Sequence, residues 1–197
     1  MFGSIPPVTR ALILANVAVF LLQQVFGNAL IAWFALWPLG SGLFHAWQLV
    51  TYAFLHGGIA HIFLNMFALY KFGRTLETYW GGRRFLFYYF ICVIAAGLTQ
   101  LAVQAAGAAA EPVLGASGGV FGVLLAFGWY FPKQRLIVLP IPIPIPAWLF
   151  VTLYALAELF FGLTGKQPDV AHFAHLGGML GGALCILYWR ARQRFNS

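Results

Sequence analysis

Residues 115–122 read GASGGVFG, and this stretch places a single hydroxyl, that of Ser117, among four glycines in a strongly apolar chain. Gly118 and Gly122 are four residues apart and so share one face of a helix. Small residues at this spacing let two membrane helices approach backbone to backbone. A second glycine-rich stretch, HLGGMLGG at residues 175–182, supplies a matching face. We therefore expect the helix that begins near Ser117 to pack against the helix that contains the second stretch.

The composition indicates that this packing takes place in a membrane. The chain has 197 residues, of which 62% are hydrophobic and 8% are charged. Its apolar runs are long enough to cross a hydrocarbon core of about 30 Å, which takes roughly 20 helical residues. These features predict an all-α polytopic membrane protein with residues 1–197 as one domain. The six expected spans are Val8 to Asn28, Gly58 to Tyr79, Arg84 to Gln104, Ser117 to Tyr130, Pro146 to Leu163, and Val170 to Trp189.

The basic residues fall at alternate ends of these spans, and they predict the topology. Lys and Arg gather on the cytoplasmic side of membrane proteins. Only Lys166 falls on the other side, so we expect both termini in the cytoplasm. The net charge of +7 then reflects the topology and favours contact with the lipid bilayer. It does not indicate binding to nucleic acid. The residues on the cytoplasmic side are Arg10, Lys71, Arg74, Arg83, Arg84, Lys133, Arg135, Arg190, Arg192 and Arg194.

Two segments outside the spans have a distinctive composition. Residues 29–50 contain no Lys, Arg, Asp or Glu but carry three tryptophans, so we expect an outer loop that lies partly in the membrane interface. An ordinary loop packed on the helix ends is the alternative. Residues 139–147, LPIPIPIPA, cannot continue a helix and predict an extended cytoplasmic connector.

Polar residues on three separate spans are expected at a common depth. Ser117, the pair His61 and Asn65, and His175 each lie within one or two turns of the outer surface, at about 1.5 Å per residue. A serine hydroxyl becomes a nucleophile when a neighbouring base accepts its proton, and imidazole suits that task near neutrality. His61 and Asn65 share a helix face and, like the backbone N–H of Ser117, are candidate donors to an oxyanion.

The acidic residues give this site no clear third member. Asp169 precedes His175 by six residues and is expected at the surface, so a Ser/His pair is favoured over a triad. Glu158 falls inside the fifth span, where a carboxylate can relay protons or ions, form a hydrogen bond while protonated, or extend outward. His172 is expected to be structural or interfacial. The sequence leaves the roles of Glu158 and His172 open.

Three motifs together carry a family resemblance. GASGG opens one helix, HIFLN lies on an earlier one, and AHLGGMLGG lies on the last. With WQLVTYAFLHGG and GRTLETYWGGRRFL, the chain resembles the six-helix bacterial form of the rhomboid family of intramembrane serine proteases. The resemblance implies that the chain is an integral protein of the bacterial inner (plasma) membrane. Gln48 and Tyr79 stand where family members often carry Arg.

The resemblance also implies a mechanism. Ser117 would be the nucleophile and His175 the general base, while His61, Asn65 and Gly115 would support the oxyanion. The family cleaves transmembrane segments of other membrane proteins, here near the extracytoplasmic face, and uses neither a metal, a cofactor nor ATP. The oligomeric state is not predicted.

Three other function classes predict different sequence features. A catalytically silent rhomboid-like protein, acting in membrane-protein binding or quality control, would usually lack the Ser or the His that this chain keeps. A transporter predicts inverted repeats with interrupted helices, which the sequence does not show. A metalloprotease predicts a motif such as HExxH, and a metal site at His172 and His175 lacks further ligands in the sequence.

Overall fold

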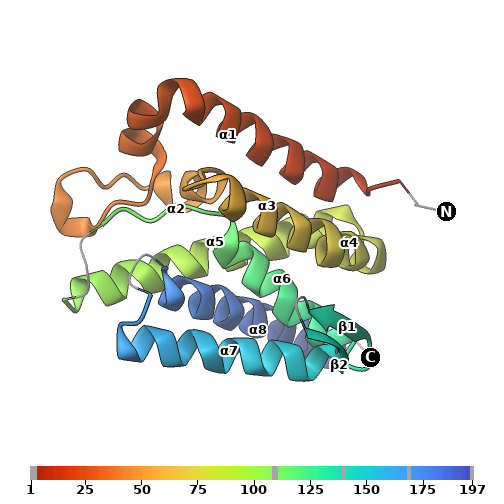
Figure 1. The fold of residues 1–197 in the computed structure, drawn as a ribbon. Helices are drawn as coiled ribbons and strands as arrows, with labels where there is room; N and C mark the ends of the chain where they lie inside the picture. The colour runs from red at the N-terminus through yellow and green to blue at the C-terminus, as the bar shows by residue number, and fades with distance from the viewer. Residues whose placement is uncertain (1–3, 108–110, 139–140, 168–169, 196–197) are drawn as a thin grey trace.

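In the computed structural model, which describes residues 4–107, 111–138, 141–167 and 170–195, the chain forms a helical bundle with one short β-hairpin (Figure 1). All six predicted spans are helical. The longer helices are α1 (Pro7–Phe34), α3 (Ile59–Ala68), α4 (Arg74–Trp80), α5 (Gly82–Ala105), α6 (Ser117–Tyr130), α7 (Ala147–Thr164) and α8 (His172–Phe195). The hairpin consists of β1 (Arg135–Val138) and β2 (Ile141–Pro146), and shorter turns include α2 (Gln48–Thr51).

Helix α6 lies at the centre of the bundle. Its bounds, Ser117–Tyr130, are those predicted for the fourth span, and 10 of its 14 residues are buried. A side chain added at Gly118 would meet Ala96 of α5, and one added at Gly122 would meet Cys92 of the same helix. The glycines therefore let α6 sink between its neighbours, which a helix of larger residues could not do.

The expected contact between α6 and α8 is confirmed, but only part of the second glycine stretch makes it. A Cβ at Gly178 would strike the backbone carbonyl of Gly118, so the two helices touch main chain to main chain. Gly177 and Gly181 instead face α5, where Thr99 and Ala95 lie. Helix α8 is thus packed closely on two helices at once.

Fewer helices than the six expected are long and apolar enough to count as complete membrane spans. Among the described residues, α1, α5 and α7 are long and apolar enough to cross a membrane. A fourth span results if the bent pair Gln48–Phe54 and Ile59–Trp80, at 101° to each other, is counted as one. With 14 residues, α6 is short for the hydrocarbon core, and it is enclosed by the other helices.

Two helices run six residues beyond their predicted ends, α1 to Phe34 and α8 to Phe195. Helix α1 continues to Phe34 rather than ending at Asn28, because Gly27 and Asn28 fall just after a kink at Phe26 and do not stop the helix. The outer loop is therefore shorter than residues 29–50. The second span runs from Ile59 through the π-helical turn η3 (Leu69–Gly73) into α4.

The proline-rich connector is extended over residues 141–146, but it is not an isolated strand. It pairs antiparallel with β1, with Arg135 opposite Pro146 and Leu136 opposite Ile145. The alternation of Ile and Pro permits this pairing, because each Ile has the backbone N–H that its neighbouring Pro lacks. The described chain is thus not wholly α-helical, and residues 139–140 of the predicted connector lie outside the described part.

Two buried polar side chains tie the start of α1 and the outer loop to the bundle. Glu77 accepts hydrogen bonds from the backbone N–H groups of Val8 and Thr9, at 2.8 and 2.6 Å, and so caps the start of α1 with a negative charge. Gln48 accepts from the backbone N–H groups of Trp37 and His45. Gln48 therefore holds the outer loop together.

Aromatic rings of the outer loop remain exposed. His45 stacks on Trp47 and lies 6.1 Å from the ring of Trp33. Both tryptophans are exposed, at 59% and 46%. This placement agrees with an interfacial loop, which stays a prediction.

The start of α1 and the end of α8 lie at the same end of the bundle (Figure 1). The connection between α7 and α8, which carries Lys166, lies at the opposite end (Figure 1). This arrangement agrees with the alternation of charges in the sequence.

The close contact at Gly178 predicts a strong effect on stability. Gly178→Ala should lower the free energy of unfolding by about 1–3 kcal/mol, because overpacking moves two backbones apart. The matched control is Gly27→Ala on α1, where a Cβ would have nothing within 4 Å. Denaturation of both variants in detergent checks this, and equal stabilities would contradict the packing described.

Candidate active site

The hydroxyl of Ser117 lies at the first residue of α6, and the chain before it is fixed by backbone hydrogen bonds. Leu36 and Val113 exchange two backbone hydrogen bonds of 2.9 Å, and the N–H of Gly115 donates to the carbonyl of Tyr52 at 2.9 Å. Gly115 has a φ of +134°, a conformation that L side chains rarely adopt. The hydrogen bonds with Leu36 and Tyr52 thereby fix the direction in which the chain enters α6.

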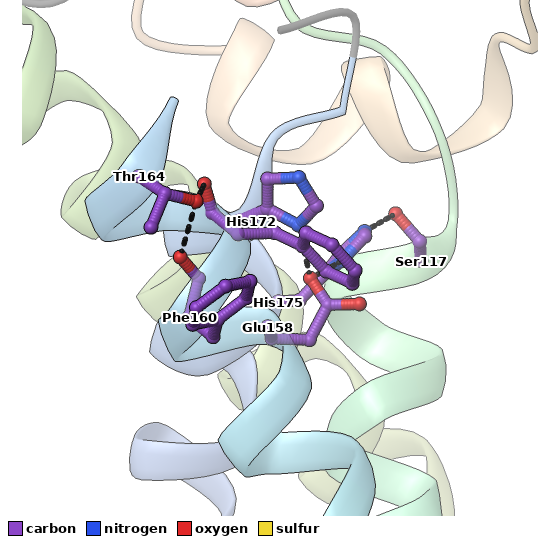
Figure 2. A network of polar contacts seen from close by, with 7 residues as sticks. Ser117, Glu158, Phe160, Thr164, His172 and His175 are labelled. Atoms are coloured by element: carbon purple, nitrogen blue, oxygen red, sulfur yellow. Dashed lines mark hydrogen bonds and ion pairs between the residues drawn. The ribbon is translucent and has the colours of Figure 1, made fainter. Parts of the chain in front are cut away.

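The structure brings Ser117 and His175 together. The Oγ atom of Ser117 and the Nε2 atom of His175 lie 2.8 Å apart, which is hydrogen-bond distance (Figure 2). The imidazole stacks on the ring of Phe121, with centroids 4.1 Å apart and planes 6° from parallel. Phe121 stacks in turn on Tyr154 of α7. Aromatic packing therefore fixes the plane of His175.

A carboxylate also reaches this imidazole, and the expectation that none would do so is wrong. The Oε2 atom of Glu158 lies 2.9 Å from Nδ1 of His175 and 2.7 Å from Nδ1 of His172 (Figure 2). All three side chains are buried. The reason is that α7 and α8 are neighbours joined by a short connection, so Glu158 faces the start of α8. Asp169, the acid weighed from the sequence, lies outside the described residues.

His61 approaches the same place from α3. Its Nδ1 atom accepts a hydrogen bond from the backbone N–H of Gly57 at 3.3 Å, so the proton of the neutral ring is on Nε2. A Cβ built on Gly115 would lie 2.9 Å from that Nε2 and 3.6 Å from Oγ of Ser117. Because Gly115 has no side chain, a space remains there, flanked by the Nε2–H of His61 and the hydroxyl of Ser117.

Asn65 is less directly involved than the sequence suggested. Its side chain is buried, and its Nδ2 donates to the backbone carbonyl of His61 at 2.9 Å. Within the described part of the chain it makes no hydrogen bond with Ser117. Its contact supports the turn that carries His61.

The three residues around the carboxylate also satisfy the composition of a metal site. Glu158, His172 and His175 offer ligand atoms within 4.8 Å of one another, so the two histidines have the further ligand that the sequence did not reveal. A tetrahedral zinc with bonds of about 2.1 Å would hold its ligand atoms roughly 3.4 Å apart. The observed separations of 2.7 and 2.9 Å match hydrogen bonds instead.

Comparison with known proteins places this geometry in a family. The family model described as the Rhomboid domain matches residues 43–192, which include Ser117, His175 and His61. The chain belongs to the rhomboid family. Its membrane helices are therefore those of a rhomboid protein, and the family includes serine proteases and inactive members.

Relatives with this domain occur in mitochondria and in bacteria. Rhomboid protein 1, mitochondrial, of Saccharomyces cerevisiae is 35% identical over 139 residues, covering 70% of this chain and 40% of the relative. RHOMBOID-like protein 12, mitochondrial, of Arabidopsis thaliana is 29% identical, covering 95% and 60%. Rhomboid protease GlpG of Yersinia pestis is 26% identical, covering 95% and 64%. The chain thus spans 40% to 64% of the length of these relatives.

Two residues of this rhomboid site were not assigned from the sequence. Phe121 gave no signal beyond its position, one helical turn after Ser117. Glu158 did give one, since it is a lone acid in an apolar span that faces the next helix. Counting residues back from the α7–α8 connection gives its height along α7, but not the direction in which its side chain points.

The space beside Gly115 predicts a sensitive position. Gly115→Ala should lower the rate of Ser117 modification by about 100-fold, the typical loss of one oxyanion donor, because the methyl group displaces the ring of His61. Gly58→Ala is the matched control, since a Cβ there meets nothing within 4 Å. Rates of labelling by a fluorophosphonate check this, and equal rates for the two variants would refute the assignment of this space.

Proposed function

We propose that this rhomboid protein is an intramembrane serine protease in which Ser117 is the nucleophile and His175 the general base. Residues 1–197 would act as one rhomboid-like domain. The observation that carries the proposal is the separation of 2.8 Å between Oγ of Ser117 and Nε2 of His175. A serine paired in this way with an oriented imidazole is suited to acyl transfer.

The reaction proceeds in two halves. Oγ of Ser117 bonds to the carbonyl carbon of the substrate while Nε2 of His175 takes the hydroxyl proton. As the peptide C–N bond breaks, His175 returns this proton to the departing amine. Water then attacks the acyl-enzyme and gives a proton to His175, which passes it to Ser117 as the ester C–O bond breaks.

The oxyanion of each tetrahedral intermediate would bind in the space beside Gly115. The Nε2–H of His61 faces this space. The backbone N–H of Ser117 is free for the same purpose, because the first N–H groups of a helix have no acceptor within the helix. Asn65 supports the oxyanion through its hydrogen bond to the backbone of His61.

Transmembrane segments of other proteins are the proposed substrates. The site lies at the first turns of α6 and α8 (Figure 2). A helix that spans the membrane has its carbonyls in internal hydrogen bonds, and it frays most easily near its end. Cleavage is therefore proposed near the membrane boundary, on the face that carries the site.

The orientation and the membrane are part of the proposal. The basic residues at the end that holds both termini support a cytoplasmic location for that end, so the site opens toward the extracytoplasmic side. Relatives from mitochondria and bacteria support an integral membrane protein, and the bacterial inner membrane stays a proposal. The bilayer is the one partner that the composition implies, and the oligomeric state is not assigned.

The nucleophile predicts the outcome of covalent labelling. A fluorophosphonate should label the wild-type protein in detergent but not Ser117→Ala, because a phosphonate adduct needs the activated hydroxyl. Ser41→Ala, in the outer loop, is the control that should keep full labelling. EDTA should leave the labelling unchanged, since the base is an imidazole and not a metal-bound water.

The same experiment separates the alternatives. Labelling that survives Ser117→Ala would remove the proposed nucleophile. Loss of activity in EDTA with rescue by zinc would indicate a metalloenzyme. A folded wild-type protein that is never labelled, and that binds membrane proteins without cutting them, would instead be a catalytically silent rhomboid-like protein in binding or quality control.

The depth of the site predicts which substrates are cut. Single-span proteins with small residues just before the cleaved bond, and Gly, Pro or polar residues just beyond it, should be cleaved fastest because their helices unwind easily. Replacing those helix-weakening residues with Leu should slow cleavage while binding persists. Mass spectrometry of the products locates the cut, and a cut at the cytoplasmic end would contradict the proposed depth.

A further inference from the structure

The acid of α7 forms a continuous chain of contacts with the proposed nucleophile and base. Oε2 of Glu158, the imidazole of His175 and Oγ of Ser117 are linked by distances of 2.9 and 2.8 Å. They come from three different helices, α7, α8 and α6 (Figure 2). Such an arrangement has the order of acid, imidazole and hydroxyl found in serine hydrolase triads.

The two contacts of Glu158 with histidines depend on which ring nitrogens carry protons. His172 and His175 both approach the same oxygen, Oε2, through Nδ1. A protonated carboxyl group could donate to only one of them, whereas an ionised carboxylate accepts from both. With the carboxylate ionised, both Nδ1 atoms carry protons, and Nε2 of His175 keeps the lone pair that faces Ser117. This is the tautomer that a general base requires.

We propose that Glu158 is a positioning residue for His175, holding its ring with the proton on Nδ1 and stabilising the imidazolium that forms when Ser117 gives up its proton. This inference rests on the proposed protease function. Glu158 itself gains no proton during the reaction, since the proton moves only between Ser117, His175 and the substrate. His172, the first residue of α8, contacts the same oxygen through Nδ1 at 2.7 Å and so joins α8 to α7.

The surroundings explain why a carboxylate is retained at this position. A charged group within an apolar bundle is costly unless it is paired and hydrogen-bonded. The side chain of Glu158 is 8% exposed and receives two N–H groups at short distance. If Glu158 only joined α7 to α8, its hydrogen bond with His172 would be enough. Its second contact is with His175, the imidazole that faces Ser117.

The test compares Glu158→Gln, Glu158→Asp and His172→Phe for turnover of a transmembrane substrate, for KM and for thermal stability in detergent. The amide of Gln can donate to Nδ1 and so favour the wrong tautomer of His175. We expect kcat to fall at least about tenfold for Glu158→Gln, with KM and the melting temperature near the wild-type values. Glu158→Asp, which keeps the charge, should have an intermediate kcat.

His172→Phe is the matched structural control. It removes the other hydrogen bond of Glu158 but leaves the one to His175, so it should reduce stability more than kcat. Equal losses of kcat in His172→Phe and Glu158→Gln would mean that the carboxylate only joins the helices, and would overturn the proposal. If Glu158→Gln does not fold, Glu158→Asp decides, since wild-type kcat in that variant would also overturn it.

The outcome separates this inference from the function on which it rests. An active wild-type protein whose Glu158→Gln variant keeps full kcat contradicts only the role of Glu158. A wild-type protein that is not labelled at Ser117 and cuts no substrate overturns the protease function and the role of Glu158 together.

Discussion

The contact between the backbones of α6 and α8 is the constraint on which the rest of the structure depends. At Gly118 and Gly178 the two main chains touch, and no residue with a side chain fits there. This contact sets the distance between the first turns of the two helices, which carry Ser117 and His175. Since a hydrogen bond tolerates only a few tenths of an ångström, the separation of 2.8 Å depends on the glycines that follow Ser117 and His175 on their helices.

Three buried acidic or amide side chains support the first helix, the outer loop and the site through defined hydrogen bonds. Glu77 caps the first helix, Gln48 organises the outer loop, and Glu158 accepts from two imidazoles. In an apolar environment an unpaired polar group is costly, so each of these contacts fixes one geometry strongly. The outer loop and the hydrogen bond from Gly115 to Tyr52 then fix the entry to α6. Rigidity of the site follows from this set of long-range hydrogen bonds as much as from the core.

The sequence predicted the helices and the meeting of Ser117 with His175, because apolar length and glycine spacing are local signals with direct physical meaning. It did not predict that α1 would continue to Phe34 or that β1 would pair with the proline-rich segment, since both depend on tertiary contacts. Glu158 was missed for a related reason. Its partners lie on the next helix, and the rotation of α7 about its own axis, which decides where the carboxylate points, cannot be counted from residue spacing.

The central claim is that Ser117, His175 and Glu158 form one reacting unit beside a space lined by His61. The most direct measurement is a high-resolution structure of the protein after reaction with a fluorophosphonate. The account predicts phosphorus bonded to Oγ of Ser117, a phosphonyl oxygen within hydrogen-bond distance of Nε2 of His61, and Nδ1 of His175 still bound to Glu158. A phosphorus atom on another residue, or a phosphonyl oxygen directed away from His61 with Glu158 detached from His175, would contradict it.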